Sequence, residues 1–438
     1  MSKRIFFLIF LWSTLLFSQH TIKGTFTNAE DYKYALLYKM APLSTEYIGN
    51  AEIKEDGSFI LPLEASATSG MYKVVYAMPK EEYNFDIIYN AKEDIEFTFD
   101  SETGISFQES LENKLLQGYT SSMALISQSI GNFYMQESTD TLALKDIFKT
   151  QKETQSNFEA AAEGTIALEF IKANKPYIPD DFEEVTAYIK NLESHFFDAV
   201  DFNNMILQSS DFLVERMYNY ILGIGAGSSD ISANYIKNID AFYLAMQNAP
   251  LEIKSSLLLQ LWQTMADSDF ELVANYISDN YLINIAKELN DQVLIDSLVQ
   301  FKNTSKESKA PDFYLDEQKS QKKLSDLTGY EYYVIVFWSS ACSHCLHEIP
   351  QLERFVKTLN ESELQVVAVG LENDDKAWAE TIKKYPDFIH VLGLGKWDND
   401  IGNQYDIKAT PTYFVLDKNK HIVAKPNDVE ALKAFFEK

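Results

Sequence analysis

The stretch Tyr333-Val-Ile-Val-Phe-Trp338, followed after three residues by Cys342-Ser343-His344-Cys345, decides the fold of the C-terminal part of this chain. The apolar run is typical of a strand buried in a sheet. A C-x-x-C just beyond such a strand is typical of a redox-active dithiol in a βαβ unit. The chain has no other cysteine in 438 residues, so its sulfur chemistry is confined to this pair.

Two cysteines also limit the other uses of sulfur. A disulfide scaffold would need several pairs, and a structural zinc site would need about four ligands. One metal alternative is copper or zinc held by Cys342, Cys345 and His347, because thiolates suit soft metals. Only three ligands are visible there, and the pair suits a disulfide better. We therefore predict no metal site.

The pattern around this stretch predicts a three-layer α/β domain over residues 310–438. Strand and helix signals follow in the order strand, helix, strand, helix, strand, helix, two strands, helix. The predicted strands are Val334–Trp338, Gln365–Gly370, Phe388–Leu392, Thr412–Leu416 and His421–Ala424. The clearest later helices are Asp374–Tyr385 and Val429–Phe436. The polar stretch Lys302–Lys309 has the composition of a linker.

The chain upstream of this stretch has two further patterns. Residues 20–105 alternate apolar and polar positions between turn signals, as in Thr21–Phe26 and Ser58–Leu61, and predict a small antiparallel β-domain resembling a sandwich. Residues 106–301 show helical periodicity and predict an all-α region. The cluster Gly223–Gly227 follows a helical run and lacks a Lys-Ser/Thr ending, so it predicts a loop and no nucleotide site.

The N-terminus has the layout of a secretory signal peptide. Lys3 and Arg4 precede an apolar stretch, and small Ser18 precedes Gln19 at the expected cleavage point. The alternative is a retained membrane anchor, but the stretch is shorter than the roughly 20 residues that a spanning helix needs. We predict a signal peptide at residues 1–19 and a location in the periplasm or cell envelope.

Composition restricts the partners. Hydrophobic residues make up 46% of the chain and aromatic residues 13%, which is typical of filled cores. The formal charge of −27 is uneven: residues 1–308 hold 44 acidic and 22 basic residues, a net −22, and residues 309–438 hold a net −5. An acidic surface argues against nucleic acid and anionic lipid as partners.

Five motifs in the last 130 residues occur together with a characteristic order and spacing. They are Ala310-Pro-Asp-Phe313, Phe337-Trp338, Cys342-Ser-His-Cys345, Glu348-Ile-Pro350 and Ala409-Thr-Pro411-Thr-Tyr-Phe-Val-Leu-Asp417. In this respect the C-terminal part resembles the TlpA/ResA-like thioredoxin family of extracytoplasmic thiol–disulfide oxidoreductases. The N-terminal β-domain also resembles the small sheet module that often precedes envelope thioredoxin domains. The resemblance implies a multidomain protein ending in an α/β thioredoxin fold.

The expected position of the cysteines suggests their roles. Cys342 falls where the strand passes into a helix, and the unpaired N–H groups and dipole of a helix start favour its thiolate. The thiolate is the form that attacks a disulfide, so Cys342 is the predicted nucleophile. Cys345 lies one turn further and is the predicted resolving thiol.

Two neighbours are expected to tune the pair. A histidine directly before the second cysteine resembles the arrangement in DsbA and protein disulfide isomerase, so His344 is predicted to stabilise the thiolate and make the couple more oxidising than thioredoxin. Glu348 lies one turn past Cys345, where the family carries a glutamate that exchanges protons with the buried thiol. Thioredoxin uses a buried aspartate instead, and Val336 occupies that position here. The alternative for each is an ordinary surface side chain without a role in the chemistry.

The resemblance also implies a substrate-binding edge. Pro411 corresponds to the family's cis-proline, whose turn exposes the backbone of Thr410 for pairing with an extended substrate. Trp338 has a family counterpart that packs near the site. The family's second tryptophan, before the first cysteine, is replaced by Ala341, which leaves a smaller rim.

The sequence therefore predicts an exported thiol–disulfide oxidoreductase. Its expected partners are protein thiols and disulfides and a membrane electron donor or acceptor, with no cofactor beyond the Cys342–Cys345 disulfide. The direction of electron flow, the clients and the oligomeric state are not encoded in these motifs. The alternative is an envelope binding protein whose dithiol serves as a redox sensor or copper carrier.

Overall fold

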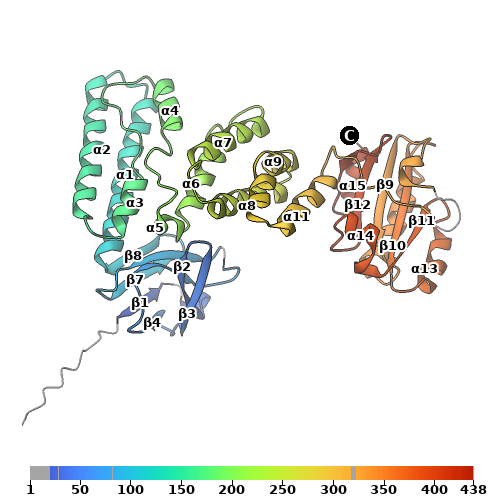
Figure 1. Ribbon diagram of the computed structural model, residues 1–438, viewed down its shortest axis with the longest axis horizontal. Coiled ribbons are helices and arrows are strands. Elements are labelled where there is room, and N and C mark those ends of the chain that lie inside the picture. The colour runs from blue at the N-terminus through green and yellow to red at the C-terminus, as the bar shows by residue number, and fades with distance from the viewer. Residues whose placement is uncertain (1–19, 28, 81, 317–321, 438) are drawn as a thin grey trace, which may run out of the picture. The chain divides into compact units, whose positions relative to one another are not determined.

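The computed structural model describes residues 20–437 except 28, 81 and 317–321. The predicted signal peptide at residues 1–19 lies outside the described residues. The chain divides into two compact units, Met1–Leu257 and Leu258–Lys438 (Figure 1). This division falls within the segment predicted to be helical, ahead of the predicted linker. Among the described residues, no helix combines the length and apolar character needed to cross a bilayer.

The first unit begins with a β-sandwich of two four-stranded sheets. One sheet has the order β4-β1-β7-β8 and the other β3-β2-β5-β6. The strands are β1 Thr21–Phe26, β2 Tyr34–Ala41, β3 Ser44–Glu52, β4 Ser58–Pro62, β5 Gly70–Val75, β6 Asn84–Tyr89, β7 Ile95–Asp100 and β8 Gly104–Glu109. The sandwich was predicted. Its sheets are antiparallel except for β1 and β7, which run parallel.

Alternation along the strands builds the sandwich core. In β1, every second residue is buried, from Ile22 to Phe26. Phe26 stacks on Phe59 of β4, with ring centroids 5.4 Å apart. Gly24, which pairs with Phe59 across the two strands, leaves room for this ring, because a Cβ there would lie 2.2 Å from it. Between the two sheets, the ring of Phe85 of β6 packs edge-on against that of Phe97 of β7, with centroids 5.3 Å apart.

Helices complete the first unit. They are α1 Leu111–Met135, α2 Thr141–Ala161, α3 Ala167–Ala173, α4 Val185–Ser194, α5 Met205–Gln208, α6 Phe212–Ile221, α7 Ile231–Ala245 and the start of α8 Leu251–Asp267. Side chains of Ser110, Asp140 and Asp230 accept hydrogen bonds at the starts of α1, α2 and α7. Residues 223–227 form turns between α6 and α7, as the loop prediction required.

The second unit contains the last helices of the α-region and the C-terminal domain. The helices are α9 Glu271–Ile277, a π-helical turn Ser278–Leu282, α10 Ile283–Leu289 and α11 Gln292–Asn303. The central all-α region predicted from periodicity is therefore present.

The C-terminal domain is built on a five-stranded sheet of order β11-β10-β9-β12-β13. Its strands are β9 Tyr332–Trp338, β10 Leu364–Glu372, β11 Ile389–Leu394, β12 Thr412–Asp417 and β13 Ile422–Ala424. Its helices are α12 Ser343–Val356, α13 Lys376–Thr381, α14 Asp400–Gln404 and α15 Val429–Phe436. The strands β9, β10 and β11 are parallel, and β12 and β13 are antiparallel to their neighbours. This is the predicted α/β thioredoxin fold.

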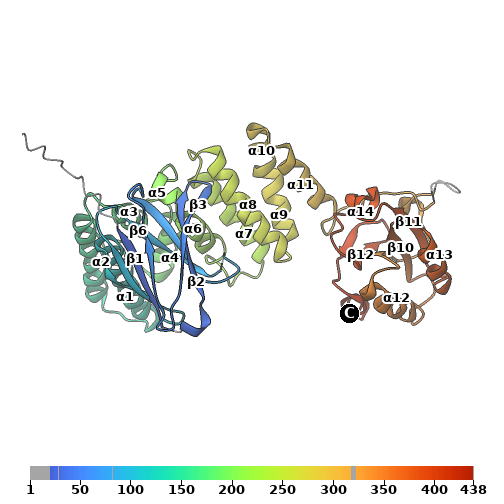
Figure 2. The ribbon, with the colours of Figure 1, turned by 90° about the horizontal axis from the view of Figure 1, so that it is seen from below.

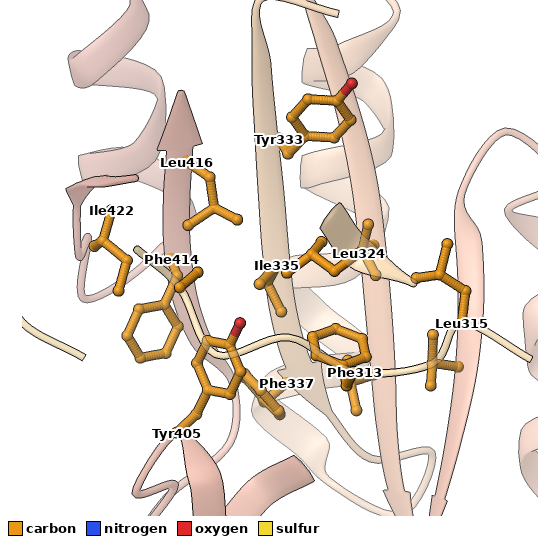
Figure 3. Packing of buried hydrophobic residues seen from close by; sticks show 14 of the residues in the cluster. Phe313, Leu315, Leu324, Tyr333, Ile335, Phe337, Tyr405, Phe414, Leu416 and Ile422 are labelled. Carbon is orange, nitrogen blue, oxygen red and sulfur yellow. The ribbon is translucent and has the colours of Figure 1, made fainter. Parts of the chain in front are cut away.

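Both faces of the sheet are covered by helices, so its central strands read as continuous apolar runs. On one face, Val334, Val336 and Trp338 of β9 pack with residues of α12 and α15. On the other face, Ile335 and Phe337 pack with Tyr405, which follows α14 (Figure 3). Figure 2 shows α12 and α14 on opposite sides of the sheet. Packing on both faces of the sheet thereby holds the end of β9 in place.

The polar stretch before the domain is joined to the sheet. The N–H of Glu307 donates to Ile422 O at 2.7 Å, and the N–H of Ile422 donates to Ser308 O at 2.9 Å. Lys309 and His421 form an antiparallel bridge. Residues 307–310 thus continue the sheet beyond β13, although their composition is that of a linker.

Candidate active site

Cys342 follows β9 after three residues and caps the start of α12. Its Sγ accepts a hydrogen bond from the N–H of Cys345 at 3.2 Å. The sulfur therefore takes the place of the side-chain oxygen found at many helix starts, where unpaired N–H groups favour negative charge. Cys342 is partly exposed, and Cys345 is completely buried in the core beneath α12.

The two thiols have opposite electrostatic environments. Partial burial opposes ionisation of Cys342, but hydrogen bonds from Cys345, from the Thr410 side chain and from the His344 backbone lower its pKa. Burial and the hydrogen bond with Cys342 raise the pKa of Cys345 to about 12. At neutral pH, Cys342 is therefore the thiol that ionises more readily.

The turn before β12 faces this pair. The Thr410–Pro411 peptide is cis, as the family resemblance implied. The thiol of Cys342 lies 3.3 Å from the carbonyl oxygen of Thr410. The Thr410 side chain also lowers the pKa of both thiols. Thr410 was predicted as a site residue for its backbone only, and this effect of its side chain was not predicted.

Glu348 is partly buried and held in place. Its Oε2 accepts hydrogen bonds from the Tyr413 hydroxyl at 2.8 Å and from the N–H of Val429, at the start of α15, at 3.1 Å. Tyr413 also lies close enough to Cys345 for the two groups to interact electrostatically. Tyr413, which was not predicted as a site residue, thus holds Glu348 by a hydrogen bond.

The remaining predicted residues are placed differently. Trp338 is completely buried at the end of β9, in the same hydrophobic core as Cys345. Its ring therefore packs beneath the dithiol and is not exposed to a client. His344 and His347 are exposed. Of His344, the main-chain N–H is the part that contributes to the lowered pKa of Cys342. A role for its imidazole stays a prediction.

A buried carboxylate behind the dithiol was not predicted. Glu372, the last residue of β10, is only 5% exposed. Its carboxylate accepts hydrogen bonds from the Ser339 hydroxyl at 3.2 Å and from the N–H of Ser340. The predicted strand ended at Gly370, which assigned Glu372 to a loop. In the sequence, the position of Glu372 directly after an apolar run was the one feature that could have pointed to it.

The metal alternative would need at least three ligand side chains close together. Within the described part of the chain, no three His, Cys, Asp or Glu side chains gather where they could hold a metal ion. The donors around the two sulfurs are hydrogen-bonding groups of the main chain and of Thr410. Such groups can stabilise a thiolate, and two cysteines one helical turn apart can close a disulfide.

Comparisons with known proteins agree with the fold. Residues 329–422 match the family model described as thioredoxin-like. The chain is 26% identical over 117 residues to the thiol-disulfide oxidoreductase ResA of Bacillus cereus, covering 26% of this chain and 66% of that protein. The ResA of Geobacillus kaustophilus is 26% identical over 116 residues, with 65% of it covered. The chain thus spans about two thirds of the length of these relatives.

Among solved structures, the chain is similar to a domain of a possible thiol-disulfide isomerase from Cytophaga hutchinsonii. The two are 33% identical over 30% of this chain and 90% of that one, with a TM-score of 0.27.

Proposed function

We propose that this chain, whose C-terminal domain is thioredoxin-like, is an extracytoplasmic thiol–disulfide oxidoreductase that exchanges disulfides with partner proteins. The observation that supports this most is the asymmetry of the pair. Cys342 is accessible, caps a helix and has a lowered pKa, whereas Cys345 is buried next to it with a raised pKa. A nucleophile and a resolving thiol need this difference.

The proposed reaction has two steps. The Cys342 thiolate attacks one sulfur of a client disulfide, so a mixed disulfide forms and the other client sulfur leaves as a thiolate. Cys345 then loses its proton and attacks the Cys342 sulfur. The Cys342–Cys345 disulfide forms, the second client thiol is released, and two electrons have passed to the client. The reverse sequence oxidises a client.

Neighbouring groups assist these steps. The N–H of Cys345 and the Thr410 side chain stabilise the Cys342 thiolate. Glu348, held by Tyr413 and Val429, accepts the proton of Cys345 directly or through water. The Thr410–Pro411 turn offers its backbone to an extended client segment. The redox-active disulfide is the only prosthetic group that this reaction requires.

The proposed extracytoplasmic location is based on the N-terminal sequence, where the positively charged Lys3 and Arg4 precede an apolar stretch and the small residue Ser18. In that compartment, a membrane donor or acceptor would recharge the dithiol after each turnover.

The direct test is equilibration of the purified protein with glutathione buffers. We expect a reversible two-electron couple that Cys342→Ser abolishes. Cys345→Ser should accumulate mixed disulfides with several clients, because the resolving step is lost. A redox sensor or copper carrier would trap one partner or none. A wild-type protein without a reversible couple would refute the proposal.

A further inference from the structure

The segment between β9 and α12 is held by a single buried carboxylate. Glu372 ends β10, and Gly370 of the same strand pairs with Trp338 at the end of β9, so the carboxylate lies beside the segment that leads to Cys342. A buried charge is costly unless hydrogen bonds compensate it. Ser339 and Ser340, the first two residues after β9, supply those hydrogen bonds.

Ser339 connects this carboxylate to both cysteines. It is 3% exposed, and its hydroxyl donates to Glu372 and lies 3.3 Å from the N–H of Ala341. Its carbonyl accepts from the N–H of Cys342 at 3.1 Å. Its main chain also lowers the pKa of Cys345, against the larger effect of burial. Ser339 therefore fixes the backbone of Cys342 and lies between Glu372 and the nucleophilic cysteine.

We infer that Glu372 and Ser339 are positioning residues of the dithiol: the carboxylate fixes Ser339 and Ser340, and the carbonyl of Ser339 holds the backbone of Cys342 at the helix start. This inference rests on the proposed function, because it concerns how well the same pair exchanges disulfides. Neither residue touches the client.

Loss of the Glu372 or Ser339 side chain should change the redox chemistry of the dithiol and not only the stability of the fold. If residues 339–341 loosen, Cys342 departs from the helix start and its thiolate loses hydrogen bonds. The reduced form is then less stabilised, whereas the disulfide form keeps its covalent link. A loosened segment should therefore make Cys342 less reactive and the couple more reducing. An ordinary structural anchor would destabilise both redox forms alike and leave their ratio unchanged.

The test uses Glu372→Gln and Ser339→Ala in the full chain, with Glu271→Gln as a matched control. Glu271 is an equally buried carboxylate in the same unit, 5% exposed, and it accepts from the N–H of Lys306, away from the cysteines. Three quantities are measured for each protein: the rate of Cys342 alkylation by iodoacetamide at pH 6, the equilibrium constant with glutathione, and the melting temperatures of the oxidised and reduced forms.

We expect both site variants to be alkylated about three- to tenfold more slowly than wild type, with the glutathione equilibrium displaced toward the protein disulfide by a similar factor. Glu271→Gln should lower the melting temperatures and leave both chemical quantities at wild-type values. If Glu372→Gln does not fold, Ser339→Ala decides the question alone. Wild-type reactivity and equilibrium in a folded site variant would overturn the inference. A wild-type chain that lacks a reversible couple would instead refute the proposed function.

Discussion

At the scale of single residues, hydrogen bonds distinguish two chemically identical side chains. Cys342 and Cys345 are three residues apart, yet one has a lowered pKa and the other a raised one. The difference arises from the helix start, where the N–H of Cys345 donates to the sulfur of Cys342, and from the deeper burial of Cys345. The Thr410 side chain lowers the pKa of both thiols.

Thr410→Val should slow alkylation of Cys342 about three- to tenfold at pH 6, because the loss of the hydroxyl removes a hydrogen bond to its thiolate and raises its pKa. Thr410→Ser keeps the hydroxyl and is the matched control. The rate is measured with iodoacetamide across pH 5 to about 9, which also gives the thiol pKa directly. A valine variant with the wild-type profile would show that the main chain alone stabilises the thiolate.

A second residue, His390, makes the free energy of unfolding depend on pH. Burial lowers the pKa of His390, while its Nε2 hydrogen-bonds Tyr385 O at 2.8 Å, and its Nδ1 is buried without a partner. Below pH 6.5, the unfolded chain binds a proton that folded His390 resists. Its contribution to stability is therefore complete above that pH and is lost as pH falls toward the lower pKa of the folded state.

We accordingly expect the free energy of unfolding to decrease between about pH 7.5 and pH 5, and the decrease to be smaller in His390→Gln. Urea unfolding of both proteins at the two pH values measures this difference. Equal decreases would mean that other groups cause the acid sensitivity.

Some residues of the site could be predicted from the sequence, and others could not because their contacts join distant parts of the chain. Cys342, Cys345 and Pro411 stand out by type and spacing. Glu372 and Tyr413 act through the side chains that the fold places opposite them, and those partners lie 32 to 65 positions away. A contact over such a distance leaves no local periodic signal.

At the scale of elements, the predicted strands of the β-domain were those in which buried and exposed residues alternate. β1 buries every second residue and was found with its observed bounds. β3 and β8 have few buried positions, β6 buries three consecutive residues, and none of these three strands was among those predicted. In the C-terminal domain, both faces of the sheet are covered, so every strand showed an apolar run. The boundary at residues 302–309 stays a prediction.

The helices that precede the C-terminal domain are joined to it by a buried carboxylate. Glu271, at the start of α9, accepts from the N–H of Lys306 at 2.6 Å and forms an ion pair with Lys425, which follows β13. Glu271→Ala should lower the free energy of unfolding by about 1.5 to 3 kcal/mol, the usual effect of losing a hydrogen bond to a charged group. Urea unfolding with Glu271→Gln, which keeps an acceptor, provides the comparison. A loss below about 0.5 kcal/mol would contradict it.

At the scale of the whole molecule, the net charge of −27 should govern which small disulfides react fastest. Oxidised glutathione is an anion, and cystamine is a dication. Raising the salt from about 0.01 M to about 1 M shortens the Debye length from roughly 30 Å to 3 Å. The reaction of Cys342 should therefore accelerate with glutathione and slow with cystamine.

Stopped-flow fluorescence at the two salt concentrations gives both rates, and Cys342→Ser is the blank. Rates that change in the same direction for both disulfides would indicate that salt acts on the protein itself and not on the encounter.

The pairing of residues 307–310 with β13 has a consequence for the molecule in a crowded compartment. β13 is an edge strand that carries an exposed Val423, and an open edge is a template on which strands of other chains can add. The preceding segment occupies part of that edge through the N–H and carbonyl of Ile422. A protein cleaved or truncated just before residue 310 would expose it. Such a product should form insoluble aggregates more readily than the intact chain.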